Sequence, residues 1–451
     1  MKNRAKIFKL GVLSALTAGL LLPLPVGAAE AAAIDSGDTA WILASAALVM
    51  LMTPGVALFY GGMVRKKNVL SILMQCFTIL ALVSVQWVLL GYTLSFGPDV
   101  KGIIGDLSFL GLSGVGLGPS DTYGTTIPNT VFVVFQGMFA IITAALITGA
   151  FAERMKFSAF VIFTLLWTTL VYDPLAHWVW GGGFLGKLGA LDFAGGTVVH
   201  ISSGVSGLVA ALVLGKRLSK QREAILPHNL PMTVTGAALL WFGWFGFNAG
   251  SALAANGLAG MAFLVTNTAA AAGAMSWVVA EWLDHGKPTI FGAVSGAVAG
   301  LVAITPAAGY VTPLASILIG IMVGPVCYLA VSRVKEKLGY DDALDVFGIH
   351  GVGGTLGALA TGLFATTVIN SAAANGLFYG NPHQLWVQFL SVLASWVYAG
   401  GMTFLILKGI SWVTSLRVNQ EEEEMGLDAA IHGEDAYGYS EMGVEGTGVA
   451  R

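Results

Sequence analysis

Charge and cysteine are scarce in this sequence. Only 10% of the 451 residues are Asp, Glu, Lys or Arg, whereas 56% are hydrophobic, which excludes an ordinary soluble protein and indicates a polytopic membrane protein. The two cysteines, Cys76 and Cys327, lie in different apolar stretches and match no zinc or redox spacing, so we expect buried thiols and no metal. The net charge of -3 says nothing about partners, and we expect no nucleic acid among them. The chain does have 60 glycines, which suit helices that pack closely in lipid.

The N-terminus has the pattern of a secretory signal peptide. An apolar run at 10–22 and small residues at 28–33 follow four basic residues, Lys2, Arg4, Lys6 and Lys9. The alternative is an uncleaved twelfth helix, but the apolar run is short for a membrane span. In both cases the residues that follow begin outside the cell. We predict a signal peptide at 1–33, a membrane domain at 34–416 and a tail at 417–451.

Eleven apolar stretches of the membrane domain are each long enough to cross a bilayer core of about 30 Å. They lie near residues 39–62, 68–96, 128–152, 157–180, 195–215, 229–250, 257–283, 289–307, 311–332, 344–367 and 384–414. With eleven spans, the mature N-terminus and the C-terminus lie on opposite sides of the membrane. The sequence therefore predicts an all-α polytopic membrane protein.

Basic residues in the loops predict the orientation. The loops on one side contain thirteen of them: Arg65, Lys66, Lys67, Arg154, Lys156, Lys216, Arg217, Lys220, Arg222, Lys287, Arg333, Lys335 and Lys337. The loops on the other side contain only Lys101 and Lys187. Because cytoplasmic loops are enriched in Lys and Arg, the first side is predicted to be cytoplasmic. In the cell inner or plasma membrane, the mature N-terminus is then outside and the tail is cytosolic.

Two of the stretches repeat one pattern. Asp192 precedes His200 by eight residues in the fifth stretch, and Asp342 precedes His350 by eight in the tenth. Glycines follow at matching positions, Gly204 and Gly207 in the first case and Gly354 and Gly357 in the second. Eight helical residues extend about 12 Å, so the histidines approach the membrane centre from opposite faces. This predicts a five-plus-five inverted repeat with one extra C-terminal helix.

The two histidines have three readings. Ionisable residues inside a membrane are functional candidates, and two neutral imidazoles can line a narrow path for a small polar molecule because each ring donates and accepts hydrogen bonds. Alternatively, His200 and His350 are separate packing residues, each bonded to a nearby carbonyl. A metal site is the third reading, but no further His, Cys or carboxylate cluster lies at the same depth. We expect no metal and no other cofactor.

Aromatic residues gather at the outer ends of the third, fourth and sixth stretches. Phe135 and Phe139 are four residues apart on one helical face, Trp180 ends the fourth stretch, and Phe247 and Ser251 end the sixth. One reading is an aromatic belt at the membrane interface combined with ordinary packing. The other is a vestibule where aromatic faces attract a small cation and the serine oxygen accepts a hydrogen bond from it.

Acidic residues are expected to have structural roles. Asp192 is predicted to cap the helix that follows it rather than to bind a cation directly, and either Asp342 or Asp345 is predicted to cap the tenth. Asp173 precedes a proline that should kink the fourth stretch; the sequence assigns it no role, and His177, four residues on, is a candidate partner for it. The outer loop at 97–127 is either an ordered lid or a simple surface loop. The run at 421–424 predicts a solvated or disordered tail.

Five motifs along the chain resemble those of one family. They are FYGGMVRKKN at 59–68, AHWVWGGG at 176–183, DFAGGTVVH at 192–200, GWFGFNAGS at 243–251 and DVFGIH at 345–350. Together they resemble the ammonium transporters of the Amt, Mep and Rh superfamily, in particular its bacterial Amt branch, over essentially the whole mature chain. The resemblance implies eleven helices around one pore per subunit and a homotrimer of such subunits in the membrane lipid.

The resemblance also implies roles for single residues. Phe139, Trp180 and Ser251 look like an outer ammonium recruitment site. Phe139 and Phe247 look like a stacked gate below it, with Phe135 helping to organise the site. His200 and His350 look like the twin histidines of the pore, and Asp192 like the family's structurally required acidic residue. The tail, with 426–428 and 432–434, resembles a regulatory tail that communicates between subunits and with a PII-type nitrogen regulatory protein.

We therefore predict a transporter for ammonium, with methylammonium as an analogue. A bare charge is costly at the membrane centre, so ammonium should lose its proton near the gate and pass the histidines as neutral ammonia. Three other functions stay open. A sensor would usually carry an extra output domain and an enzyme would need a nucleophile or metal constellation, and the sequence has neither. A related channel for carbon dioxide or urea is the nearest alternative.

Overall fold

The structure is a computed structural model that describes residues 34–218 and 226–438. The predicted signal peptide at 1–33 and the end of the predicted tail at 439–451 lie outside the described residues. The described chain is helical apart from its loops and one antiparallel ribbon, in which β1 (Asp99–Val100) pairs with β2 (Ile104–Gly105). The all-α prediction is therefore confirmed.

The first half of the chain forms five apolar helical segments. They are α2 (Ser36–Met63); α3 (Val69–Gln86) with η2 (Trp87–Gly91) and α4 (Tyr92–Phe96); α5 (Asn129–Ile147) with η4 (Thr148–Phe151); α6 (Phe157–Trp167) with η5 (Thr168–Tyr172) and α7 (Asp173–Val179); and η6 (Gly196–Ile201) with α9 (Ser202–Leu214). The loops hold η1 (Lys66–Asn68), η3 (Leu110–Leu112) and α8 (Phe184–Leu188). Pro174 lies at the start of α7, directly after the π-helical turn η5. The irregularity that the proline predicted therefore falls at this turn.

The second half forms six further segments. They are α10 (Leu230–Gly250), α11 (Gly257–His285), α12 (Ile290–Ile304), α13 (Pro313–Leu329) with η8 (Ala330–Val334) and α14 (Lys335–Leu338), η9 (Phe347–Gly351) with α15 (Val352–Phe364), and α16 (Pro382–Ser411), which follows η10 (Leu377–Tyr379). Four of these helices begin after a polar residue whose side chain accepts a first-turn N–H: Asn229, Asn256, Thr289 and Thr312. Such caps explain where these helices begin.

Ten helical segments of the described chain are long and apolar enough to cross a membrane. They coincide with ten of the eleven predicted stretches. The remaining one, predicted near 289–307, forms α12, whose 15 residues extend about 22 Å and fall short of a bilayer core about 30 Å thick. The multi-pass membrane fold is thus confirmed, whereas the count of eleven spans stays a prediction.

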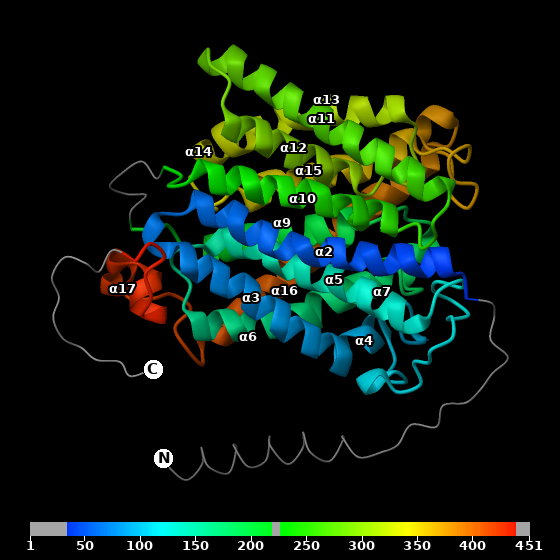
Figure 1. Ribbon diagram of the computed structural model, residues 1–451, viewed down its shortest axis with the longest axis horizontal. Coiled ribbons are helices and arrows are strands. Elements are labelled where there is room, and N and C mark those ends of the chain that lie inside the picture. Colours follow the sequence, from blue (N-terminus) through cyan, green and yellow to red (C-terminus); the bar gives the residue numbers. More distant parts are fainter. Residues whose placement is uncertain (1–33, 219–225, 439–451) are drawn as a thin grey trace, which may run out of the picture.

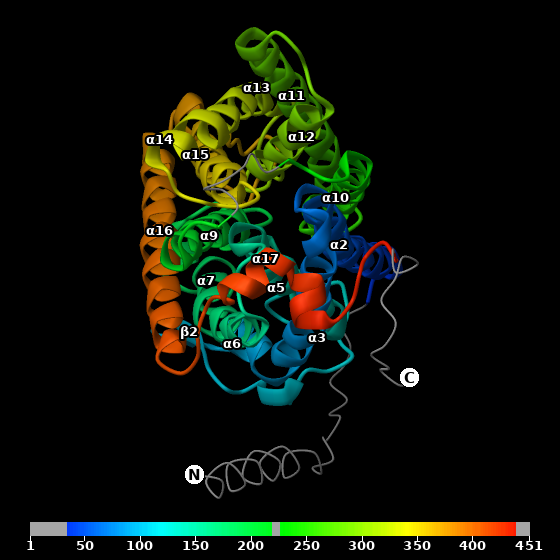
Figure 2. The same cartoon turned by 90° about the vertical axis from the view of Figure 1, so that its left-hand side faces the viewer.

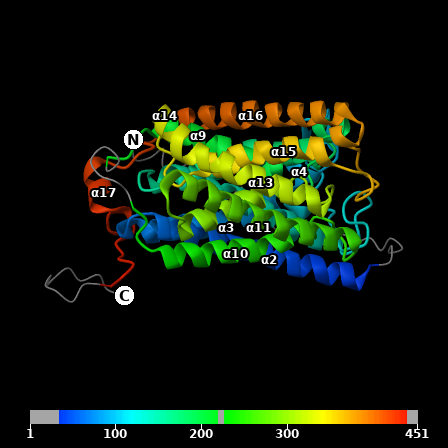
Figure 3. The same ribbon diagram turned by 90° about the horizontal axis from the view of Figure 1, so that it is seen from above.

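The long helices run side by side, so the molecule has two ends (Figures 1 and 3). We call the end formed by residues 417–438, which include α17 (Gln420–Met425), the tail face, and the end formed by the loop at 97–128 the loop face. Figure 2 looks onto the tail face and shows α11, α12, α13 and α15 on one side and α3, α5, α6 and α7 on the other. Between them, α2 packs against α10, and α16 runs along the flank of both groups.

Residues 417–438 of the tail are folded, so of the two alternatives for the acidic run, a solvated or a disordered tail, the disordered one does not hold there. Residues 420–425 form α17, and η11 (Asp428–His432) follows. The Glu423 side chain is buried and accepts hydrogen bonds from the backbone N–H of Leu218 and from the Arg417 guanidinium. These contacts fold the acidic run onto the tail face. The prediction that Cys76 and Cys327 are buried thiols is confirmed.

Candidate functional site

His200 and His350 meet inside the bundle. Their rings stack with centroids 5.3 Å apart and planes at 23°, and their Nδ1 atoms are 3.3 Å apart. Both are almost fully buried, at 1% and 4% exposure. They are therefore one contacting pair, and the reading of two separate packing histidines does not hold.

Each histidine lies in a π-helical turn, η6 for His200 and η9 for His350. Such turns insert one residue into a helix and are frequent at functional sites. Glycines let the two turns touch. A Cβ on Gly204 would lie 2.1 Å from the backbone N of Gly351, and a Cβ on Gly354 would lie 2.9 Å from the Cβ of His200. The repeated glycines are thus required by the close approach, whereas the π turns left no signal in the sequence pattern.

Asp192 organises the segment that bears His200. Its carboxylate accepts hydrogen bonds from the backbone N–H groups of Gly195 at 2.8 Å, Gly196 at 2.6 Å and Thr197 at 2.7 Å, and from the Thr197 hydroxyl. Its backbone carbonyl accepts from the indole N–H of Trp180 at 2.8 Å. The carboxylate is thus engaged by its own segment, while the carbonyl orients Trp180.

Asp342 caps the segment that bears His350. One carboxylate oxygen accepts from the backbone N–H of Phe347 at 2.7 Å, and the residue is fully buried. Burial raises the pKa of Asp342 to about 6, although the nearby Lys335 ammonium opposes the rise. Asp345, the other candidate cap, instead binds Lys335 at 2.6 Å. Of the two residues considered from the sequence, Asp342 therefore has the capping role.

The predicted aromatic residues form a continuous line of rings from the loop face to the histidines. Trp180 meets Phe139 edge-on at 6.0 Å, Phe139 stacks on Phe247 at 4.3 Å, and Phe247 lies over His200 at 6.0 Å. Phe135 contacts Phe139 at 5.0 Å. The three phenylalanines are buried, with exposures of 0% or 1%, so they are not an interfacial belt.

Ser251 lies at the end of α10, half-buried at the loop face. Its hydroxyl donates to the carbonyl of Phe247 at 2.8 Å, which leaves the serine oxygen able to accept. Phe247 therefore connects two predicted features: its carbonyl holds Ser251, and its ring stacks on Phe139. The predicted recruitment and gate residues thus lie together at the loop-face end of the site.

Two residues beside His200 were not identified from the sequence. Trp244 stacks on His200 with ring centroids 5.4 Å apart, and its indole N–H donates to the Thr305 hydroxyl at 2.9 Å. The same hydroxyl lies 3.3 Å from Nε2 of His200. Trp244 falls within the GWFGFNAGS motif, but nothing in the motif assigns it a role. Thr305 follows the last residue of α12 and belongs to none of the motifs.

A small, largely enclosed cavity lies along the histidine pair. It is lined by His200, His350, Trp244 and Phe247 and by apolar side chains from α2, α5 and neighbouring helices. Its volume of about 10 Å³ is at the lower limit for one water-sized molecule. In the described residues, no group of three or more His, Cys, Asp or Glu side chains is arranged to hold a metal ion.

His177 does not pair with Asp173, so that candidate pairing does not hold. Nε2 of His177 lies 2.9 Å from Oδ1 of Asp99, which the ribbon brings to the end of α7, whereas the buried Asp173 carboxylate accepts from the Gln86 amide at 2.7 Å. The hydrogen bond from His177, together with Lys187, lowers the pKa of Asp99 to about 2. Tertiary contacts thus replace the candidate pair within one helix.

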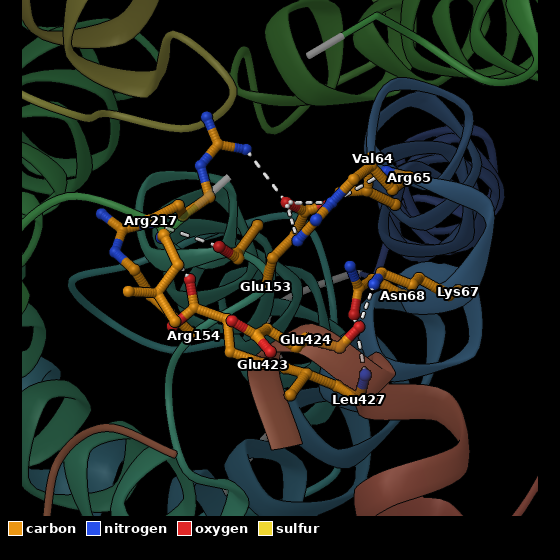
Figure 4. A network of polar contacts seen from close by, with 12 residues as sticks. Val64, Arg65, Lys67, Asn68, Glu153, Arg154, Arg217, Glu423, Glu424 and Leu427 are labelled. Carbon is orange, nitrogen blue, oxygen red and sulfur yellow. Dashed lines mark hydrogen bonds and ion pairs between the residues drawn. The ribbon is translucent and has the colours of Figure 1, made fainter. Parts of the chain in front are cut away.

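A cluster of buried charges lies at the tail face (Figure 4). Glu153 binds Arg65 at 3.1 Å and Arg217 at 3.3 Å, and Arg217 also binds Asp341 at 2.9 Å. Burial alone would raise the pKa of Glu153, but the two guanidinium groups outweigh burial and lower it. Arg217 likewise holds the pKa of Asp341 well below its usual range despite burial. The sequence showed these arginines only as loop charges.

The tail closes over this cluster. Asn68 accepts a hydrogen bond from the backbone N–H of Leu427 at 2.8 Å, and the Lys67 ammonium donates to the carbonyl of Glu424 (Figure 4). Asp428 accepts from the backbone N–H of Ser71 at 2.8 Å, at the start of α3. The tail therefore contacts the loop that joins the first two membrane helices.

Comparison with known proteins agrees with this architecture. The model of the Ammonium Transporter Family matches residues 40–437. An ammonium transporter of Bacillus subtilis (strain 168) is 60% identical over 404 residues, which cover 90% of this chain and 99% of that protein. Ammonium transporter Amt1 of Archaeoglobus fulgidus is 49% identical over 405 residues, which cover 90% of this chain and 100% of that protein.

A solved structure has the same fold. The crystal structure of Saccharomyces cerevisiae Mep2 matches with a TM-score of 0.83 at 39% sequence identity, and the match covers 91% of this chain and 93% of that chain. The family match, the sequence relatives and this fold agree over most of the described residues. The chain belongs to the ammonium transporter family, whose members are transporters or channels and not enzymes.

Proposed function

We propose that this ammonium transporter recruits NH₄⁺ at the loop face beside Phe139, Trp180 and Ser251, removes its proton near the Phe139–Phe247 stack, and conducts NH₃ past His200 and His350. Family membership supports the substrate. The observation that carries the pathway is the unbroken line of rings from Trp180 through Phe139 and Phe247 to the histidine pair.

Desolvation supports the loss of the proton. An aromatic face attracts a cation, and a serine oxygen accepts from its N–H groups, so Trp180, Phe139 and Ser251 suit NH₄⁺. Beyond them the cavity is narrow and mostly apolar, and there a bare charge would be costly. Ammonia can hydrogen-bond to imidazole and carries no charge. Potassium has no proton to lose and is therefore rejected.

The direction of uptake rests on the predicted orientation. With the tail face cytoplasmic, transport runs from the loop face to the tail face in a cell inner or plasma membrane. The described tail packs against the loops at this end. We propose, from the resemblance alone, that the protein is a homotrimer and that the tail offers a contact for a PII-type nitrogen regulatory protein.

Uptake into liposomes tests the proposal. Purified wild-type protein should import radiolabelled methylammonium, and ammonium should compete. His200→Ala and His350→Ala each remove a buried hydrogen-bonding ring, and we expect uptake to fall by about tenfold or more or to lose its discrimination against potassium. His383→Ala, at an exposed histidine near the start of α16, is the matched control and should behave as wild type.

Two results would count against the proposal. Wild-type protein that imports no methylammonium, or imports it without competition from ammonium, would contradict the substrate. Unchanged rate and selectivity in both buried-histidine variants would contradict the pathway while leaving the family membership intact.

A further inference from the structure

We propose that Thr305 sets the direction of hydrogen bonding through the histidine pair, so that His200 carries its proton on Nε2 and His350 carries its proton on Nδ1. Thr305 is then a positioning residue for the conduction path, and its effect on transport rests on the proposed function. The proposal follows from the number of protons and lone pairs available around one buried hydroxyl.

The Thr305 hydroxyl has one proton and two acceptor sites. It donates the proton to the carbonyl of Leu301 at 2.8 Å, in the preceding helical turn. An indole nitrogen can only donate, so the bond of 2.9 Å to Trp244 uses one acceptor site. The remaining acceptor site faces Nε2 of His200 at 3.3 Å.

This count determines the tautomer of His200. The hydroxyl has no second proton to offer, so Nε2 of His200 must be the donor in their contact. A neutral imidazole carries one N–H, and Nδ1 of His200 is therefore an acceptor. Thr305 is fully buried, so no solvent is available to replace it as the acceptor.

The same reasoning extends to His350. Nδ1 of His350 lies 3.3 Å from Nδ1 of His200. Two lone pairs facing each other in a buried site would repel, so Nδ1 of His350 carries the proton and donates it. Nε2 of His350 is then a bare acceptor, and no group in residues 34–218 or 226–438 donates to it.

The consequence for transport is a difference between the two rings. Both nitrogens of His200 are engaged, by Thr305 and by His350. Nε2 of His350 is the ring nitrogen that remains to accept an N–H from ammonia. Thr305, directly after α12 and outside the line of rings, thus fixes which histidine offers a lone pair to the substrate.

Solid-state ¹⁵N NMR of histidine-labelled protein in lipid bilayers tests the assignment directly, because a protonated ring nitrogen and a bare one give different shifts. The signals of each ring are identified by their loss in His200→Ala and in His350→Ala. In the wild type we expect His200 protonated on Nε2 and His350 protonated on Nδ1. Thr305→Val keeps the shape and removes the hydroxyl, and both rings should then show mixed tautomers. Thr305→Ser keeps the hydroxyl and should give the wild-type spectrum.

Uptake is measured on the same samples. Thr305→Val should lower methylammonium uptake by about tenfold, the effect of one lost buried hydrogen bond, and Thr305→Ser should recover most of it. Thr361→Val is the matched control: Thr361 is also fully buried, and its hydroxyl donates to the carbonyl of Gly357 four residues earlier, but it is hydrogen-bonded to no histidine in residues 34–218 and 226–438. That variant should keep the wild-type tautomers.

The wild-type spectrum alone can overturn the proposal, even if Thr305→Val does not fold. A proton on Nδ1 of His200 and none on Nε2 would contradict it. So would a Thr305→Val spectrum with the wild-type tautomers. Wild-type protein with the expected tautomers but no uptake would instead contradict the proposed function and leave the role of Thr305 standing.

Discussion

The segment that bears His200 (η6 and α9) and the segment that bears His350 (η9 and α15) have the same order of Asp, His and Gly, but different interactions stabilise them. Asp192 uses both carboxylate oxygens within its own segment, where they accept from three successive backbone N–H groups. Asp342 accepts from the backbone N–H of Phe347 through one oxygen, and its other oxygen has no partner in the described part of the chain. The first cap is thus saturated and the second is not.

Charged groups surround the second cap instead. Lys335 binds Asp345 at 2.6 Å, and Arg217 from another loop binds Asp341 at 2.9 Å. The segment of His200 is therefore fixed largely from within, whereas the segment of His350 depends on ion pairs at the tail face. A change at the tail face should accordingly reach His350 before it reaches His200.

Removing each cap should give the largest difference between the two segments. Asp192→Ala leaves at least three buried backbone N–H groups without an acceptor, at about 1–3 kcal/mol each, which is enough to prevent folding. Asp342→Ala leaves one, that of Phe347, so we expect a folded but less stable protein. Yield and melting temperature in detergent measure both. Equal losses in the two variants would show that the caps are equivalent.

The acidity of Asp342 should make only the second segment sensitive to pH. Burial raises its pKa to about 6, against about 3.9 in an unfolded chain. The folded protein thus holds this proton more tightly, and the stability that the protonated form contributes is lost as the pH rises from about 4 to about 6. Asp342→Asn cannot ionise and should escape the loss.

We therefore expect Asp342→Asn to gain on the order of 3 kcal/mol relative to the wild type between pH 4 and pH 7. Melting temperatures at several pH values measure the difference between the two proteins, and other carboxylates cancel in it. The exposed Asp121→Asn is the control and should follow the wild type. A difference that does not change with pH would mean that Asp342 ionises normally.

Each histidine segment has two matching glycines, and the more tightly packed one is the first in the segment of His200 but the second in the segment of His350. Alanine at Gly204 would place its Cβ 2.1 Å from the backbone N of Gly351, but at Gly207 the nearest atom is a side-chain carbon at 3.1 Å. In the second segment, Gly357 is the tighter position, 2.2 Å from the carbonyl oxygen of Ala303, and Gly354 is the looser one at 2.9 Å.

Overpacking at the tight positions should cost about 1–3 kcal/mol. We expect Gly204→Ala to lower stability and methylammonium uptake more than Gly207→Ala, and Gly357→Ala more than Gly354→Ala. Melting temperature and uptake rate rank the four variants. If the first glycine were the more sensitive in both segments, the two helix crossings would be equivalent after all.

The sequence predicted the structure well where a pattern of residue types is typical of only one arrangement. Long apolar stretches predicted the membrane helices, and the shared spacing of Asp, His and Gly predicted that His200 and His350 meet. The aromatic line was less determined, since Phe139 and Trp180 could equally have formed an interfacial belt until the family resemblance assigned them roles.

What could not be predicted depends on contacts between distant parts of the chain. The pairing of His177 with Asp99 requires the ribbon in the loop, and the burial of Glu423 requires Leu218 and Arg417 to converge on it. Thr305 matters because its hydroxyl lies between two rings from other helices. The π turns η6 and η9 each add one residue to a helix, and this change is too small to be predicted from the periodicity of apolar residues.

A substitution in the tail should have the smallest effect on the difference between the two histidine segments. Glu423→Gln keeps the size of the side chain and its acceptor for Leu218 but weakens the 2.6 Å ion pair with Arg417. Because Arg417 is partly exposed, the loss should be about 1 kcal/mol. Limited proteolysis should cut the tail faster, and the exposed Glu421→Gln serves as the control.

Hydrogen exchange then shows which histidine segment responds. Leu218, held by Glu423, is next to Arg217, which binds Asp341, and Asp341 precedes the cap of the second segment. The amide of Phe347 should therefore exchange faster in Glu423→Gln. The amide of Thr197 should not, because its acceptor Asp192 belongs to its own segment. Equal acceleration at both amides would mean that the segments are coupled as one unit, and that the saturated cap of Asp192 gives His200 no independence from the tail face.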